Sequence, residues 1–149
     1  MNMKPAWNMK PTWNLRLLIP TMLAISATTL STQPVQAQQE TFVMPSGNVE
    51  CTYTGPAGTS VYRPQGGLAE LSCDRAEPTY VRVIMSSRGA VKLIRNVGDP
   101  SCCGVEPKLT YGTVWRRAPF TCESNEAGII CRRDDGAGFQ MSRRGVTLS

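Results

Sequence analysis

The sequence predicts a small all-β domain, a disulfide-stapled barrel or sandwich of about six to eight short strands, after a cleaved signal peptide. Three observations lead to this prediction. Short segments alternate apolar and polar residues with a period of two, and they recur at close spacing between turns that contain glycine or proline. All six cysteines lie at or after position 51. No segment has an amphipathic helical period of useful length.

The expected strands follow from this alternation. A turn is expected at 44–47, loops at 55–67 and 98–107, and a hairpin in which Gly89 takes a positive φ. The strands are expected at 49–53, 69–73, 80–85, 91–97, 113–122, 129–133 and 139–143, with a final short one at 146–148.

The N-terminal segment has the features of a secretory signal peptide. Lys4, Lys10 and Arg16 form a basic start, 17–30 is apolar, and Val35 and Ala37 provide the small residues of a cleavage site. The apolar run is too short to span a membrane, for which about 20 residues are needed. We therefore expect a signal peptide at 1–37, a flexible tail at 38–41 and a single domain at 42–149.

A short duplication in this segment leaves the start of translation open. The hexapeptide at 2–7 is repeated with one change at 8–13. Translation from Met9 would still give a complete signal peptide, so Met1 and Met9 are both candidate start residues. Contact with a membrane is expected only through the transient signal peptide.

Composition limits the possible functions. Three of the 16 Lys and Arg precede residue 38, whereas all 11 Asp and Glu follow it, so the mature domain has a net charge of only about +2. This charge is too small to predict nucleic-acid binding. The absence of histidine excludes Ser-His-Asp and Cys-His catalysis and most zinc chemistry. An even cysteine count after a signal peptide predicts a secreted or periplasmic protein.

A series of short motifs lies in order along 46–149. They are Ser46-Gly47-Asn48-Val49-Glu50-Cys51, Cys73-Asp74, Leu109-Thr110-Tyr111-Gly112, Cys122-Glu123-Ser124, Gly128-Ile129-Ile130-Cys131, Gly136-Ala137-Gly138-Phe139 and Ser142-Arg143. With these landmarks the chain resembles a family of small secreted bacterial cysteine-containing domains of unknown function. The resemblance implies export, disulfides and a compact β domain, but no activity and no catalytic residue.

The cysteines are expected to form two cross-strand bridges, Cys51–Cys73 and Cys122–Cys131. The second pairing places Glu123 opposite Ile130 and Ser124 opposite Ile129, and makes 125–128 a rigid loop suited to recognition. Cys102 and Cys103 are adjacent, whereas the family has its middle cysteines in separate segments. Three alternatives are open for these two cysteines: a disulfide with each other, separate disulfides with other cysteines, or a redox-active thiol pair.

The candidate binding residues are Arg117, Arg132 and Trp115. Three arginine doublets (116–117, 132–133 and 143–144) mark the last third of the chain, and strand alternation gives each doublet one outward side chain. If 113–122 is one strand, Arg117 and Arg132 are the arginines that point outward. They would either bind an anionic ligand or form salt bridges with nearby carboxylates on the surface. Trp115 is expected to be partly buried among Phe120, Tyr111 and Phe139, or else exposed for stacking on a ligand.

No pair of residues stands out as catalytic. The carboxylates Glu70, Asp74, Glu77 and Asp99 have no spacing that selects two of them for acid–base work. We expect no enzyme activity, no cofactor, no metal and no nucleic-acid partner.

The expected function is therefore that of a monomeric binding module. One hypothesis is a proteinaceous inhibitor of a secreted hydrolase, in the manner of the small disulfide-bearing barrels that inhibit lysozyme. The alternative is a cell-envelope domain that binds anionic glycans through an arginine face. A protruding loop with serine, tyrosine and acidic residues would favour the inhibitor, and a flat groove of arginine and aromatic residues would favour the glycan.

Overall fold

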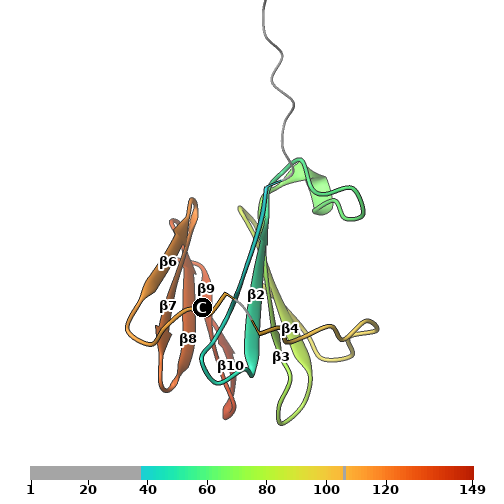
Figure 1. Ribbon diagram of the computed structural model, residues 1–149. Helices are drawn as coiled ribbons and strands as arrows, with labels where there is room; N and C mark the ends of the chain where they lie inside the picture. The colour runs from blue at the N-terminus through green and yellow to red at the C-terminus, as the bar shows by residue number, and fades with distance from the viewer. Residues whose placement is uncertain (1–37, 106) are drawn as a thin grey trace, which may run out of the picture. The chain divides into compact units, whose positions relative to one another are not determined.

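The computed structural model describes residues 38–105 and 107–149, which form two five-stranded antiparallel sheets (Figure 1). The predicted signal peptide lies outside the described residues. In both sheets every strand pairs with the next one along the chain. The first sheet contains β1 (Gln39–Val43), β2 (Val49–Thr54), β3 (Glu70–Arg75), β4 (Val81–Ser86) and β5 (Lys92–Ile94). The second contains β6 (Val114–Arg117), β7 (Phe120–Asn125), β8 (Gly128–Arg133), β9 (Gly138–Ser142) and β10 (Gly145–Leu148).

The alternation in the sequence becomes the two faces of each sheet. In β4, Val81, Val83 and Met85 are buried, whereas Arg82 and Ile84 between them are only half-buried. The inward residues of both sheets form one core, which includes Phe42, Tyr53, Leu71, Val83, Met85, Phe120, Ile129, Phe139 and Met141. The predicted all-β sandwich is confirmed.

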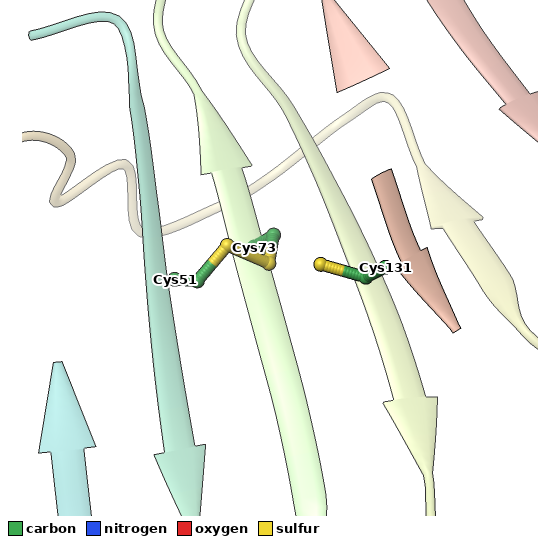
Figure 2. Close-up of side chains that lie close together, drawn as sticks. All are labelled: Cys51, Cys73 and Cys131. Carbon is green, nitrogen blue, oxygen red and sulfur yellow. A yellow bond between two sulfur atoms is a disulfide. The ribbon is translucent and has the colours of Figure 1, made fainter. Parts of the chain in front are cut away.

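Two disulfides lie at the centre of this core. Cys51 on β2 is directly opposite Cys73 on β3, and Cys122 on β7 is directly opposite Cys131 on β8. All four side chains are fully buried. The sulfur atoms of Cys51, Cys73 and Cys131 lie within 4.8 Å of one another (Figure 2), so the bridge of one sheet packs against the bridge of the other. Both predicted pairings are confirmed.

The structure distinguishes among the three alternatives for Cys102 and Cys103. Cys102 and Cys103 are bonded to each other, and among the described residues no cysteine is free. Three disulfides are typical of a domain that folds in an oxidising, extracytoplasmic environment.

Buried arginines connect the two sheets. Arg133 on β8 donates to the carbonyl oxygens of Ser86 (2.6 Å) and Gly89 (2.8 Å) at the turn between β4 and β5. Arg75 on β3 donates to the carbonyl oxygen of Ser142 on β9 (2.8 Å). Each guanidinium thus satisfies carbonyl groups of the opposite sheet, which ties the two layers together at two places.

Two predicted elements are corrected. Residues 38–41 were expected to be a flexible tail, but β1 begins at Gln39 and pairs with β2, where the Thr41 and Thr52 hydroxyls hydrogen-bond at 3.0 Å. The expected strand 113–122 is divided into β6 and β7 by a two-residue turn at Ala118 and Pro119. Proline lacks the N–H that a continuous strand would donate, and this extra hairpin and β1 help bring the count to ten strands.

Within residues 38–105 and 107–149, no helix has the length and apolar character that crossing a membrane requires.

We expect removal of the Cys122–Cys131 bridge to destabilise the domain strongly. The double variant Cys122→Ala with Cys131→Ala should lose about 2–5 kcal/mol of unfolding free energy, because the bridge closes a loop in the unfolded chain. Urea unfolding followed by far-UV circular dichroism measures the loss. The variant Cys102→Ser with Cys103→Ser is the control and should lose much less, since that bridge closes almost no loop. Equal losses in the two variants would contradict this assignment.

Candidate functional site

The loop between β2 and β3, residues 55–67, protrudes from one end of the first sheet and is called the tip loop here (green in Figure 1). At its end lies Val61, whose side chain is 93% exposed; Val105, in another loop, is 77% exposed. An apolar side chain displayed in this way is costly in water. The tip loop is therefore a candidate contact surface.

A single threonine holds the end of the tip loop in a tight turn. The Thr59 hydroxyl oxygen accepts hydrogen bonds from the backbone N–H groups of Val61 (3.3 Å) and Tyr62 (3.0 Å). The Thr59 N–H donates to the carbonyl oxygen of Tyr62 at 2.6 Å. Ser60 and Val61 thus form the apex of a turn that is closed by three hydrogen bonds.

Gly58 allows the two arms of the tip loop to meet. Its φ is +72°, and a Cβ atom there would collide with the carbonyl oxygen of Tyr62 and would lie 2.9 Å from the Cα of Arg63. Only glycine fits this position without moving the backbone.

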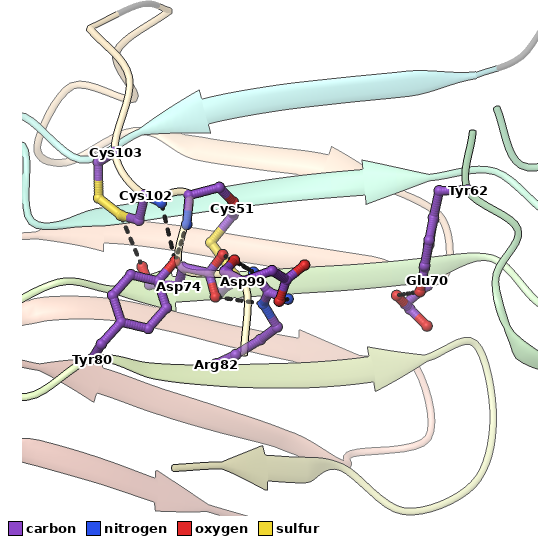
Figure 3. Close-up of polar contacts among 11 residues, drawn as sticks. Cys51, Tyr62, Glu70, Asp74, Tyr80, Arg82, Asp99, Cys102 and Cys103 are labelled. Carbon is purple, nitrogen blue, oxygen red and sulfur yellow. Dashed lines mark hydrogen bonds and ion pairs between the residues drawn. A yellow bond between two sulfur atoms is a disulfide. The ribbon is translucent and has the colours of Figure 1, made fainter. Parts of the chain in front are cut away.

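Tyr62 anchors the tip loop to the first sheet. Its hydroxyl donates to a carboxylate oxygen of Glu70 on β3 at 2.7 Å (Figure 3), and Glu70 is buried. Burial of the hydroxyl and the adjacent Glu70 carboxylate raise the pKa of Tyr62 to about 12. Lys92 on β5 adds a contact of 3.3 Å to the side-chain oxygen of Gln65. The loop is therefore ordered before any partner arrives.

A second polar cluster covers the outer face of the first sheet at its other end (Figure 3). Arg82 donates to both carboxylate oxygens of Asp74, at 2.7 and 3.0 Å, and to Asp99 at 3.0 Å. The Asp74 carboxylate raises the pKa of Arg82 further above its usual range. The Tyr80 hydroxyl accepts from the backbone N–H groups of Ser101 and Cys102, both at 3.0 Å. These contacts hold the segment that carries Cys102 and Cys103 against the sheet.

Three of the four candidate carboxylates make structural contacts. Asp74 and Asp99 meet at Arg82, whereas Glu70 binds Tyr62 near the tip loop. The backbone N–H of Glu77 donates to the Asn48 side chain at 2.7 Å, while its own side chain is exposed. Arg82 thus pairs with Asp74 and Asp99, Tyr62 binds Glu70, and only the Glu77 carboxylate is left at the surface without such a contact among the described residues.

Arg117 was predicted to point outward, and this is wrong. The turn at 118–119 reverses the alternation, so Arg117 pairs in register with buried Phe120 on the inner side of the sheet. There it contacts Glu40 at 2.6 Å and lies over the ring of Tyr53, 5.6 Å from its centroid. Arg132 is exposed as predicted, and its outward neighbour is Arg116, since both flank Thr121 in the register.

Trp115 is half-buried, as predicted, but its expected neighbours were mostly wrong. Its ring centroid lies 5.1 Å from that of Phe42 and 6.1 Å from that of Tyr53, and its indole N–H donates to Glu40 at 3.1 Å. Tyr111, one of the expected neighbours, is exposed instead. Trp115 packs against the first sheet, so its ring is not displayed for stacking on a ligand.

Cys51, Cys73 and Cys131 form the closest group of potential metal ligands in residues 38–105 and 107–149. Each sulfur is already bonded in a disulfide, and metals bind the thiolate form of cysteine. The group is accordingly part of the hydrophobic core.

Comparisons with protein families, with curated proteins and with solved structures find no match to this chain. The resemblance to the secreted cysteine-containing domains therefore stays a prediction. The sequence predicted the loop at 55–67 but not the turn that displays Val61, although Gly58 and Thr59 shortly before the valine were a usable signal for that turn.

We expect the raised pKa of Tyr62 to be visible in an absorbance titration at 295 nm. The wild-type curve should contain a tyrosine step near pH 12, and Tyr62→Phe should remove that step and no other. The unfolded pKa is near 10, so the anchoring contact is complete below pH 10 and is lost as pH rises toward 12. Identical curves above pH 11 would contradict the contact between Tyr62 and Glu70.

Proposed function

We propose that this domain is a non-enzymatic inhibitor of a secreted hydrolase, which inserts its tip loop into the active-site cleft of the enzyme. The observation that carries the proposal is Val61, an almost fully exposed apolar side chain at the apex of a loop that is already ordered. Burying a valine side chain contributes about 1.5–2 kcal/mol, and an ordered loop loses little entropy on binding.

The shape of the apex narrows the kind of contact. Thr59 to Tyr62 form a closed turn, so this segment cannot add to a partner's sheet as an extended strand. A compact apolar knob suits a concave pocket, and enzyme active sites are concave. Tyr62 and Arg63, next to the apex and both exposed, are suited to contacts with the rim of such a pocket.

The expected location of this inhibitor is the periplasm or the extracellular medium, where secreted hydrolases act. We propose that it works as a monomer, and that it belongs with the secreted cysteine-containing domains that its landmarks resemble. The oxidising environment indicated by the three disulfides supports this location.

The proposal is tested by inhibition assays against purified secreted serine endopeptidases and lysozymes. Val61→Asp should raise the inhibition constant for the susceptible enzyme at least about 100-fold, because a pocket that accepts valine leaves the new carboxylate unpaired. Gly58→Ala should also weaken inhibition, since it displaces the apex without changing its side chains. The control Val105→Asp alters another exposed valine and should inhibit like the wild type. Equal inhibition by Val61→Asp and the wild type would disprove the role of the tip loop.

A second candidate function is binding of anionic glycans on the outer face of the second sheet. The supporting observation is that Arg116 and Arg132 are exposed in one row beside Thr121. Among the described residues neither guanidinium has a carboxylate within ion-pair distance. Because Trp115 faces inward, this surface lacks the aromatic ring that was expected beside the arginines.

For this candidate, the measurement is retention on a heparin column as a function of salt. Arg116→Ala with Arg132→Ala should elute at lower salt than the control Arg88→Ala with Arg95→Ala, which removes the same charge from exposed positions elsewhere. Thermal stability should stay nearly unchanged in both, since exposed charges contribute little. Equal elution of the two double variants would reject the row as a specific site.

A further inference from the structure

A cavity of about 470 Å³ lies at the other end of β2 from the tip loop. Val49, the first residue of β2, lines it, whereas the tip loop follows the last residue of the same strand. Three turns converge there: the one between β1 and β2, the one between β7 and β8, and the one between β9 and β10 (lower end of Figure 1). This volume is in the range of small-ligand sites.

The charged lining of the cavity is mostly basic. Arg143 and Arg144 come from the turn between β9 and β10, and Glu126 from the turn between β7 and β8. Among the described residues neither arginine has a carboxylate within ion-pair distance. Both guanidinium groups are therefore free for an anionic group on a ligand.

A buried arginine adds positive charge behind the wall of the cavity. Arg75 is only 6% exposed, and it donates to the carbonyl oxygens of Ser142 (2.8 Å) and Thr79 (3.1 Å). Its Nε has no hydrogen-bond partner, and no described carboxylate pairs with it. Ser142 and Val49, the register partner of Arg75, both line the cavity. A buried cation without a counter-ion is costly, and an anion in the cavity would offset part of that cost.

The rest of the lining suits hydroxyl groups. Hydroxyl and amide side chains line the space, and Tyr111 adds an exposed aromatic ring. Amide and hydroxyl groups both donate and accept hydrogen bonds, as sugar hydroxyls require. Asn48 also lines the cavity, but it is buried and its side-chain amide is held by the backbone of Glu77. The other polar members of the lining are Ser46, Asn125, Gln140, Ser142 and Thr147.

One wall of the cavity is held in place by a close backbone contact. Gly128 has a φ of +135°, and a Cβ atom there would collide with the carbonyl oxygen of Met141 and lie 2.8 Å from the Cβ of Ser142. The Asn125 side-chain oxygen also accepts from the backbone N–H of Ala127 at 3.0 Å. Together with the Cys122–Cys131 bridge on the same hairpin, these contacts keep the wall rigid.

We propose that this cavity is a binding site for an acidic sugar, with Arg143 and Arg144 pairing with its carboxylate and the polar lining binding its hydroxyl groups. The site is independent of the proposed inhibitor function. It lies at the opposite end of β2 and uses none of the residues of the tip loop.

The test is a titration of ¹⁵N-labelled mature domain, followed by ¹H–¹⁵N correlation spectra at constant ionic strength, with three probes. Glucuronate supplies carboxylate and hydroxyls, glucose supplies hydroxyls only, and inorganic phosphate supplies charge only. Glucuronate should shift the backbone amide signals of 125–128 and 142–145 in a saturable manner. Glucose and phosphate should each bind at least about ten times more weakly.

Arg143→Ala with Arg144→Ala should weaken glucuronate binding at least tenfold and keep the spectrum of a folded domain. The control Arg88→Ala with Arg95→Ala should bind like the wild type. The proposal is overturned if glucuronate leaves these amides unshifted, or if the two double variants lose affinity equally. If phosphate binds as tightly as glucuronate, the proposal of an acidic-sugar site is overturned, and the cavity is a site for simple anions. None of these outcomes depends on inhibition of a hydrolase.

Discussion

The contact between two disulfides at the centre of the sandwich is the constraint on which the rest of the structure depends. Each bridge joins residues that are directly opposite on neighbouring strands, so each one fixes the register of the two strands that it joins. Since side chains alternate with a period of two, fixing one pair decides which residues of those strands face the core. The bridges also pack against each other, which places the two inner faces together at their middle.

The sequence was sufficient to predict the strand pairing next to the disulfides. It was insufficient to predict the side-chain positions after an unexpected turn and the contacts between the two sheets. The Cys122–Cys131 spacing predicted the pairing of Glu123 with Ile130 and of Ser124 with Ile129, and both are confirmed. The prediction for Arg117 failed because the alternation of inward and outward side chains was counted from Cys122 back to Arg117 as if the strand were continuous. The two-residue turn at 118–119 reverses that alternation in β6. The neighbours of Trp115 could not be predicted either, because Phe42 and Glu40 are more than 70 residues away in the chain.

Arginine side chains occupy several inward positions in this domain, and Arg117 is the one whose side the sequence prediction placed wrongly. Arg75, Arg117 and Arg133 all point toward the interior side of their sheets, although charged residues are usually assigned to the surface. A guanidinium has several donors in one plane, and it can therefore satisfy carbonyl groups at the ends of the opposite sheet. Arg133 has the Asp135 carboxylate at 2.7 Å as a counter-ion, which also lowers the pKa of that carboxyl group, whereas Arg75 has no counter-ion. That difference distinguishes a purely structural arginine from one beside a candidate ligand site.

The topology explains why the tip loop and the cavity both lie at the ends of strands. When every strand pairs with its neighbour in sequence, all short connections fall at the two ends of the sheets, and the faces consist of regular strands. The outer face of the first sheet is partly covered by the segment that Arg82 and Tyr80 hold in place. The ends are therefore where side chains can vary without changing the register that the buried bridges impose. An exposed valine at one end of β2 and, at the other, a buried arginine without a counter-ion among the described residues are the features of these two ends on which the two proposals rest.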